Sequence, residues 1–364
     1  MDILRSTQEF EAWLGEQVAI HSEELAYKHQ QMANRETSFP FFRGTYYRWA
    51  QVWPELCPEL QAGPRVLSVG DLHVENFGTW RDRDGRLVWG INDFDEADEL
   101  AVTNDLVRLA TSVWFAAQSA NFKFGFRKAC RAILEGYLQN LRRGGQPFVL
   151  EEEHPALRRL ALHEERDPVA FWKKLTKLLQ APESSVPEEA QAALLRALPQ
   201  PVESCVIRSR LRVGMGSLGK PRFVALAQHA GGWIAREAKA LCSPATQWVN
   251  RTSSTTTLMG EVLGKAVRCC DPLFGIDGHW IIRRLAPRCS RIELTHLSNT
   301  DDELPLLSAM GSETANIHAG TATNRQALIE HLDALSEDWL ELSAHKMAQT
   351  LQEDWKTWCR ETIA

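Results

Sequence analysis

Two acidic segments of the sequence contain the residue types and spacing that phosphate chemistry needs. Residues 70–78, called the catalytic loop below, read Gly-Asp-Leu-His-Val-Glu-Asn-Phe-Gly, and residues 91–98, called the acidic segment, read Ile-Asn-Asp-Phe-Asp-Glu-Ala-Asp. A carboxylate near a substrate hydroxyl can act as a base, while an amide oxygen and a second carboxylate can hold Mg²⁺ against phosphate oxygens. We therefore predict Asp71 as the catalytic base, and Asn76 and Asp93 as magnesium ligands. Asn76 is also expected to belong to the catalytic set.

Further carboxylates crowd the acidic segment, namely Asp95, Glu96 and Asp98. Like charges at this density are unfavourable unless a metal or an arginine neutralises them. Asp95 is therefore expected either to be a second metal ligand or to pair with Arg43, and the sequence leaves both open. His73 is expected to brace the catalytic loop and not to bind metal.

A glycine-rich loop at residues 214–219 reads Gly-Met-Gly-Ser-Leu-Gly and matches the pattern G-x-G-x-x-G. Because a strand and not a helix is expected after it, the loop does not fit the dinucleotide fingerprint. Between two antiparallel strands such a loop can instead form a flap over ATP phosphates, since glycine lets backbone N–H groups approach an anion closely. We call it the glycine flap and predict that Gly214, Gly216, Ser217 and Gly219 bind the nucleotide.

A phosphate flap needs a nearby lysine, and Lys239 lies at the end of the third strand expected in this region. Strand alternation places Lys239 on the same face as Glu237 and turns Arg236 to the opposite face. We therefore prefer Lys239 for the phosphate contact, while a one-residue bulge would put Arg236 there. An acidic residue on the next helix should pair with the lysine, and Glu261 is the candidate.

Hydrophobic periodicity and turn residues divide the chain into the elements that would position these groups. Helical patterns cover residues 6–33, 104–143, 150–200, 256–268 and about 301 to the end. Strand patterns cover residues 65–69, 86–93, 204–208, 222–226, 232–236 and 279–285. The first two strands are expected to be neighbours, so that Asp71 and Asp93 meet at adjacent strand ends. Asn104 is expected to cap the next helix, and Asp105 to hold the catalytic loop by backbone hydrogen bonds. Residues 199–201, Pro-Gln-Pro, mark a boundary.

The composition is that of an ordinary globular protein. The chain has 364 residues, of which 44% are hydrophobic and 24% charged, and its net charge is −6. No long run of Lys or Arg is present, so there is little support for nucleic-acid binding. The eight cysteines form no C-x-x-C pair, and no apolar stretch reaches about 18 residues. We expect a cytoplasmic protein without nucleic-acid or membrane partners.

Several segments resemble known protein families. Gly-Asp-Leu-His-x-x-Asn at 70–76, followed by Asp93-Phe94 and Asp105-Leu106, is similar to the catalytic and metal loops of aminoglycoside-phosphotransferase-type kinases. Over most of its length the chain more closely resembles DUF2252, a family of uncharacterised bacterial proteins. The segments that carry this resemblance are residues 42–44, 70–78, 92–96, 105–112 and 214–219.

The resemblance implies an α+β, bilobed, protein-kinase-like fold that binds ATP and Mg²⁺. In such kinases the flap precedes the catalytic loop, whereas here it follows, and the helix at 310–319 resembles the one that comes before that loop. We interpret this order as a circular permutation. The expected parts are a mainly helical lobe at 1–200, a small β-rich nucleotide-binding lobe at 201–290, and a helical segment at 291–364 that completes the large lobe.

These features predict an ATP- and Mg²⁺-dependent phosphotransferase with an unknown acceptor, either a small molecule or a protein. A nucleotidyl-transfer variant would use the same parts. Two other classes stay open. One is a metal-dependent phosphohydrolase built on Asp71, His73, Asp93 and Asp95, which leaves Lys239 unexplained. The other is a non-catalytic nucleotide-binding protein that resembles a pseudokinase.

Overall fold

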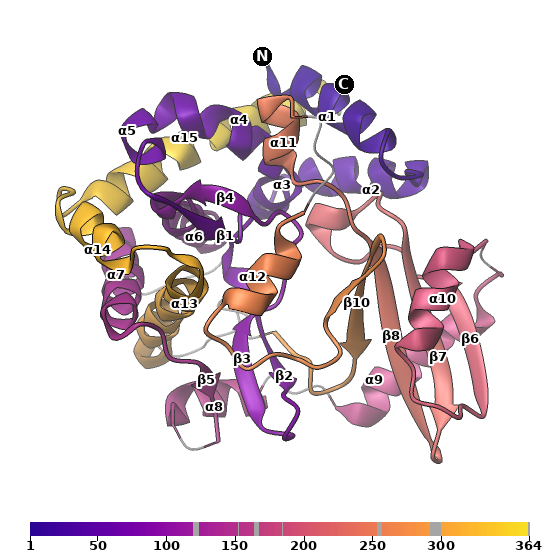
Figure 1. Cartoon of the computed structure of the whole chain (residues 1–364). Coiled ribbons are helices and arrows are strands. Elements are labelled where there is room, and N and C mark those ends of the chain that lie inside the picture. Colours follow the sequence, from indigo (N-terminus) through magenta and orange to yellow (C-terminus); the bar gives the residue numbers. More distant parts are fainter. Residues whose placement is uncertain are drawn as a thin grey trace.

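The computed structural model describes residues 1–118, 124–151, 153–163, 167–183, 185–252, 257–291 and 300–362. The described residues fold into mixed α+β structure, with three sheets and helices around them (Figure 1). This confirms the α+β class predicted from the sequence. Residue 256, where one helix was expected to begin, lies outside the described residues.

Helices precede, separate and follow the sheets. Those before residue 150 are α1 (Ile3–Gly15), α2 (Ser22–Met32), α3 (Phe39–Gly44), α4 (Tyr46–Leu56), α5 (Pro58–Gln61), α6 (Val102–Ala117) and α7 (Phe126–Arg143). Those in the middle are α8 (Pro155–His163), α9 (Pro168–Leu175), α10 (Glu188–Arg196), α11 (Ala245–Asn250) and α12 (Met259–Lys265). The last are α13 (Thr300–Thr321), α14 (Arg325–Asp333) and α15 (Trp339–Glu361). Short 3₁₀ turns are η1 (Val74–Asn76), η2 (Thr176–Gln180) and η3 (Met215–Ser217).

The helical character predicted for residues 6–33 is confirmed, but the segment is divided into two separate helices, α1 and α2. The chain between them turns toward the glycine flap, where the backbone N–H of His21 donates to the carbonyl of Gly219 at 3.0 Å. The periodicity of apolar residues continues across this break, so pattern alone did not reveal it.

Two small sheets surround the catalytic loop. Strand β1 (Arg65–Ser68) pairs with β4 (Asp98–Ala101), and β2 (Phe77–Arg81) pairs with β3 (Leu87–Ile91), which pairs with β5 (Phe148–Val149). The expectation that the strands before Asp71 and Asp93 are neighbours is wrong, because β1 and β3 belong to different sheets. The hairpin of β2 and β3 instead returns the chain, and the N–H of Asn92 donates to the carbonyl of Asn76 at 2.9 Å.

The third sheet is antiparallel, with the order β6-β7-β8-β10-β9. Its strands are β6 (Ser204–Ser209), β7 (Arg222–His229), β8 (Gly232–Ala240), β9 (Gly275–Asp277) and β10 (Trp280–Leu285). The glycine flap connects β6 to β7, as predicted. Leu194 of α10 packs on one face of the sheet, and Leu175 of α9 packs on the other. Both helices precede the boundary expected at residues 199–201, yet they pack on the sheet that follows it.

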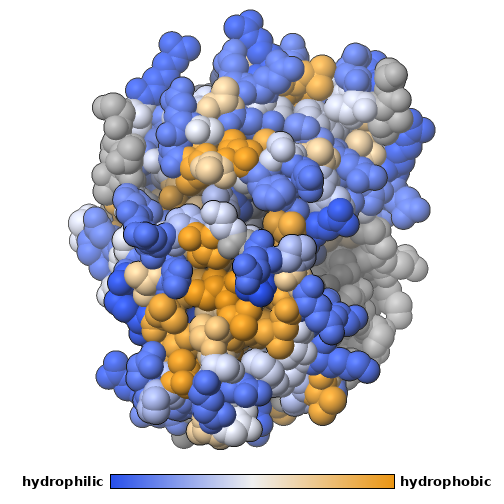
Figure 2. All heavy atoms as spheres, turned by 90° about the vertical axis from the view of Figure 1, so that its right-hand side faces the viewer, coloured by the Kyte–Doolittle hydropathy of each residue, from blue (hydrophilic) through white to orange (hydrophobic). Residues whose placement is uncertain are grey.

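The side of the molecule that carries α10 and β6 has apolar residues gathered on it (Figure 2). Leu195, Cys205 and Ile207 are partly buried there, against the apolar cluster between α10 and the sheet. Strand β6 is an edge of the five-stranded sheet and pairs with β7 alone among the described strands. The apolar contact under α10 therefore extends to the surface at this edge.

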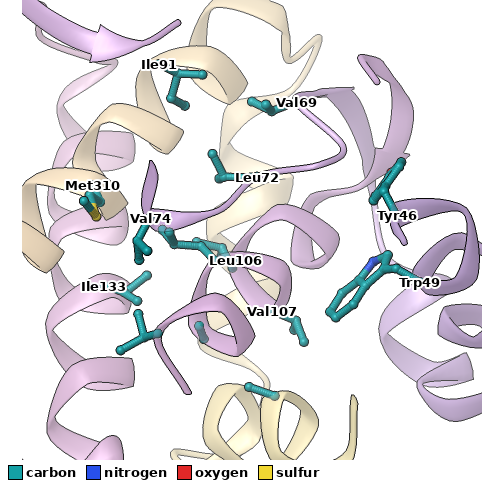
Figure 3. Packing of buried hydrophobic residues seen from close by; sticks show 14 of the residues in the cluster. Tyr46, Trp49, Val69, Leu72, Val74, Ile91, Leu106, Val107, Ile133 and Met310 are labelled. Atoms are coloured by element: carbon teal, nitrogen blue, oxygen red, sulfur yellow. The ribbon is translucent and has the colours of Figure 1, made fainter. Parts of the chain in front are cut away.

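The catalytic loop is anchored in the main hydrophobic core. Val69, Leu72 and Val74 are at most 1% exposed, and they lie among core residues that include Leu106 and Ile133 (Figure 3). Burying an apolar side chain of this size stabilises a fold by roughly 1.5–3 kcal/mol. Anchoring these apolar side chains fixes the backbone that carries the polar residues between them.

Helices α7 and α13 pack closely through glycines. A Cβ added at Gly136 would clash with the carbonyl of Ser308, and one at Gly311 with the carbonyl of Ile133. We expect Gly136→Ala to lower the free energy of unfolding by about 1–3 kcal/mol, because the helices would have to move apart. Denaturant titration measures this. Gly264→Ala is the control, since no described atom lies within 4 Å of an added Cβ there. The control should change stability little or raise it by up to about 1 kcal/mol. Equal effects of both substitutions would contradict the close packing.

All eight cysteines are free. Among the described residues, none of the helices combines the length and the apolar character needed to span a membrane.

Candidate functional site

A cavity of about 60 Å³ lies where the catalytic loop, the acidic segment and the glycine flap meet. The predicted site residues that line it are Asp71, Asn76, Asp93, Asp95, Gly214, Gly216 and Ser217. The flap lies directly on the catalytic loop, because a Cβ added at Gly216 would be 3.6 Å from Oδ2 of Asp71. Three segments far apart in the sequence therefore meet at one point. Gly219 does not line this cavity; it turns the chain with a φ of 95° beside Leu25.

The start of the catalytic loop is held by buried backbone contacts. Gly70 has a φ of 83°, and an added Cβ would clash with the carbonyl of Glu96, so the position requires glycine. The carboxylate of Asp105 accepts hydrogen bonds from the N–H groups of Val69 at 2.7 Å and Gly70 at 3.0 Å. This confirms the expected contacts of Asp105. The predicted cap by Asn104 is wrong, because α6 begins two residues earlier and Asn104 lies inside it.

A chain of buried side chains ties Asp105 to the helix that was singled out at residues 310–319. His318 of α13 lies with its Nε2 3.2 Å from Oδ2 of Asp105, and its Nδ1 is 2.8 Å from the hydroxyl of Tyr137. Asp105 and His318 are fully buried. The position of the catalytic loop therefore depends on α6, α7 and α13 together.

Asp71 is paired with an arginine that sequence reasoning did not assign. Nε and Nη2 of Arg108 donate to Oδ1 of Asp71 at 3.1 and 2.5 Å. Arg108 is fully buried, with its guanidinium 3.7 Å from the ring centroid of Phe42. Burial raises the pKa of Asp71, although Arg108 opposes that shift. The available signal was the spacing of Arg108 from Asp105, which puts both on one face of α6. One carboxylate oxygen is thus held by Arg108, while Oδ2 faces the flap.

His73 and Asn76 shape the turn η1. The N–H of His73 donates to Oδ1 of Asn76 at 2.6 Å, and Nδ1 of His73 accepts from the N–H of Glu75 at 3.2 Å. Burial, followed by the neighbouring arginines, lowers the pKa of His73 well below its usual value, so its ring is neutral. These contacts agree with the bracing role expected of His73. Glu75 pairs with Arg43 and lies 3.6 Å from Arg291.

Of the two alternatives that the sequence left open for Asp95, the pairing with Arg43 is wrong, because the ammonium group of Lys239 contacts Asp95 and Arg43 pairs with Glu75. The same Nζ lies 3.4 Å from Oδ1 of Asp93. Burial acts to raise the pKa of Asp93, but the charge of Lys239, the hydrogen bond with Asp95 and two nearby arginines together lower that pKa. Burial and the Asp93 carboxylate raise the pKa of Asp95. Asp93 is therefore the more acidic member of the pair, and its side chain is 38% exposed.

The orientation predicted for β8 is confirmed, but the partner predicted for Lys239 is wrong. Lys239 faces the acidic segment, whereas Nε of Arg236 donates to the carbonyl of Ala197 on the opposite face. Glu261 lies on α12 and pairs with Lys265 at 2.9 Å, with both side chains more than half exposed. A spacing of four residues along one helix favours this local pair, and Lys239 instead contacts the carboxylates of Asp93 and Asp95.

Sequence reasoning missed a group of arginines around a buried carboxylate. Glu237, fully buried on β8, binds Arg210, Arg222 at 3.1 Å and Arg283 at 2.6 Å. Burial acts to raise the pKa of Glu237, but the three guanidinium groups hold it well below its usual value. Arg222 also donates to the hydroxyl of Ser217, so that hydroxyl is engaged within the flap. The sequence pattern could not reveal this group, because its arginines come from β7, from β10 and from the segment that directly follows β6.

Lys220 is a second lysine at the site that sequence reasoning missed. It lines the cavity with a side chain only 6% exposed, and its Nζ lies 3.9 Å from Oε1 of Glu96. Its place directly after the last glycine of the flap was the available signal.

The residues at the cavity fit magnesium by their donor chemistry. Mg²⁺ prefers hard oxygen ligands and retains waters, with one or two protein carboxylates. Asp93 offers an ionised, partly exposed carboxylate, and the amide oxygen of Asn76 is oriented by its hydrogen bond from His73. Within the described ranges, no group of three or more His, Cys, Asp and Glu side chains is placed to hold a metal ion.

The fold is mixed α+β, and in it the loop at residues 70–78 meets the glycine-rich loop at residues 214–219. Residues 21–166 match the model of a family described as an uncharacterized protein conserved in bacteria, DUF2252. Over these residues the match supports the family predicted from the sequence. It covers the catalytic loop and the acidic segment, and it ends before the glycine flap. No curated protein and no solved structure matches the chain.

Proposed function

We propose that this protein is an ATP- and Mg²⁺-dependent phosphotransferase with a circularly permuted, bilobed, kinase-like fold. The observation that carries the proposal is the single cavity lined by Asp71, Asn76, Asp93 and the glycine flap. Phosphoryl transfer needs a base near the acceptor, oxygen ligands for the metal and backbone donors over the phosphates. These parts come from separate segments, and they meet at one place. The acceptor is an unidentified small molecule or protein.

The five-stranded sheet supports a kinase-like small lobe. In protein kinases a glycine-rich loop covers the phosphates and the phosphate-binding lysine lies on the third strand. Here the flap joins the first two strands of the sheet, β6 and β7, and Lys239 lies on the next strand, β8. The side chain of Lys239 reaches the acidic segment.

The packing of the last helices supports a permuted order. Helix α15 packs against α1 and α4, which come early in the sequence. Helix α13, near the C-terminal end, packs against β1, which leads into the catalytic loop. In a permuted kinase-like fold, a helix late in the sequence would support a catalytic loop that comes early.

The proposed roles follow from the contacts of each side chain. Asp71 would orient and deprotonate the acceptor hydroxyl, with Arg108 fixing one oxygen and leaving Oδ2 toward the flap. Asn76 and Asp93 would hold Mg²⁺, which when bound supplies charge neutralisation to the phosphates. Asp95 keeps Lys239 in place beside Asp93. Catalysis of this kind consists mostly of positioning and electrostatic stabilisation.

The metal-dependent phosphohydrolase is not supported by the contacts of the acidic segment. Two metal ions about 4 Å apart would need the carboxylates of Asp93 and Asp95 as ligands. In this structure a buried ammonium group, that of Lys239, contacts both. A single metal held by Asp93 is compatible with that arrangement.

Calorimetric titration of the full chain with a non-hydrolysable ATP analogue, with and without Mg²⁺, tests the proposal. We expect binding in the micromolar to millimolar range that requires Mg²⁺. Binding without transfer to any acceptor or to water would indicate a non-catalytic nucleotide-binding protein. No binding under either condition would refute the proposal.

Lys239→Ala should weaken ATP binding about 10- to 100-fold, because a charge-assisted contact to phosphate is lost. Adenosine, which lacks phosphates, should lose little affinity. Lys265→Ala is the matched control, since Lys265 is an exposed lysine that pairs with Glu261 away from the cavity. If ATP and adenosine lost affinity equally, Lys239 would not be the phosphate contact. Lys220, which lines the cavity, would then be tested next.

A further inference from the structure

A second cavity, of about 240 Å³, adjoins the first and shares Gly214, Arg283 and Arg291 with its lining. We call it the arginine chamber. The arginines that line it are Arg210, Arg268, Arg283, Arg284 and Arg291. Among the described residues that line the chamber, Asp271 is the only acidic one. The chamber is therefore strongly cationic and lies directly beside the acidic residues of the proposed site.

The carboxylates around the chamber are too few to neutralise its arginines. Arg210 and Arg283 share the carboxylate of Glu237 with a third arginine. Arg291 lies 3.6 Å from Glu75, which also binds another arginine. Burial and neighbouring positive charge lower the pKa of Arg291 to about 10. An excess of buried positive charge is unfavourable unless an anion compensates it.

Two guanidinium groups of the chamber have N–H donors without a hydrogen-bond partner among the described residues. In the part of the chain that the structure describes, Nε and Nη1 of Arg268 and Nε of Arg284 are buried without a hydrogen-bond partner. Arg268 lies 4.7 Å from the ring centroid of Trp80, and none of the described carboxylates is within ion-pair distance of it. Burial raises the pKa of the neighbouring Glu313 to about 7, so this acid is only partly charged at neutral pH. Buried donors of this kind are costly unless a ligand satisfies them.

We propose that the arginine chamber binds a phosphate-ester or polyphosphate group next to the cavity of Asp71 and Asp93. Guanidinium groups are planar, and they bind phosphate oxygens through paired N–H donors. The role of this group in transfer rests on the proposed function, whereas its binding does not. The group belongs either to the phosphate tail of the nucleotide or to a phosphorylated acceptor. Both sources present the same chemistry to the chamber.

Calorimetric titration with inorganic tripolyphosphate, without Mg²⁺ or nucleotide, tests the chamber directly. Arg284→Gln and Arg291→Gln should each weaken binding at least about tenfold, because each removes a charge-assisted contact. Arg196→Gln is the control, since it removes the same charge where Arg196 pairs with Asp277 on the surface, and it should leave the affinity unchanged. Two chamber variants are used so that one misfolded protein, detected by thermal unfolding, does not decide the result. Equal affinity in all variants, or an equal loss in the control, would overturn the proposal.

Titrating tripolyphosphate into protein saturated with Mg²⁺ and the ATP analogue distinguishes the two sources. Mutual exclusion would assign the chamber to the tail of the nucleotide, and simultaneous binding would assign it to a phosphorylated acceptor. Either result supports the proposal when binding depends on Arg284 and Arg291. If the protein binds the nucleotide but shows no arginine-dependent binding of tripolyphosphate, the proposed role of the chamber is overturned and the proposed function stands. If it binds tripolyphosphate through these arginines but does not bind the nucleotide, the proposed function alone is refuted.

Discussion

Asp71→Asn should reduce the rate of phosphoryl transfer by about 10²- to 10⁴-fold, the usual contribution of a positioned general base. The amide cannot accept the proton of the acceptor, although its shape is the same. Nucleotide binding should be retained, because the proposed contacts to ATP come from the glycine flap, Lys239 and Asp93. Release of ADP from ATP is the measurement, since water can replace an unknown acceptor.

Because Asp71 forms an ion pair with Arg108, a second variant of Asp71 that keeps the charge is needed. Asp71→Asn leaves a fully buried guanidinium without its partner, and breaking such a pair costs about 3–5 kcal/mol of stability. Asp71→Glu keeps the charge for Arg108 but moves the carboxylate by one methylene. If Asp71 is the base, both variants lose activity. If Asp71 serves only as the counter-ion of Arg108, Asp71→Glu should work nearly as well as the wild type, and that outcome would refute the catalytic assignment.

Asp93→Asn should abolish the Mg²⁺ dependence of ATP binding. The substitution removes the negative charge that a magnesium ion requires, while the side chain keeps its size. Affinity in the presence of Mg²⁺ should fall at least about tenfold, to the value measured without the metal. Titration of the ATP analogue at several Mg²⁺ concentrations provides the measurement.

The fold should tolerate Asp93→Asn, because Lys239 retains its contact with Asp95. Thermal unfolding checks this point. Asp84→Asn is a matched control on the exposed turn between β2 and β3, where the same charge is lost far from the chemistry. Unchanged Mg²⁺ dependence in Asp93→Asn, or the same loss in Asp84→Asn, would remove Asp93 from the set of metal ligands.

Features that depend on neighbouring residues could be predicted from the sequence. The strands on either side of the glycine flap were found because their alternation is a local property of the backbone. Alternation along β8 also predicted that Lys239 and Arg236 face opposite sides of the sheet. The grouping of Asp71 and Asn76 in one loop follows from their five-residue spacing and needs no tertiary information.

Contacts between distant segments were decided only by the tertiary structure. The sequence offered Glu261 as the partner of Lys239, but the chain places the carboxylates of Asp93 and Asp95 there. Acidic residues are common on helices, so proximity in sequence could not select the right partner. The pairing of Arg108 with Asp71 was equally invisible, because it depends on how α6 packs beneath the catalytic loop.

The sequence by itself determined which chemical groups the protein has and which short segments hold them, because hydrogen-bonding pattern and side-chain period act over a few residues. The tertiary structure alone decided which charges meet. Three arginines converge on Glu237 through the register of β6, β7, β8 and β10, and a shift of one residue in any strand would turn its side chains to the other face. The arginine chamber beside the catalytic loop exists for this reason.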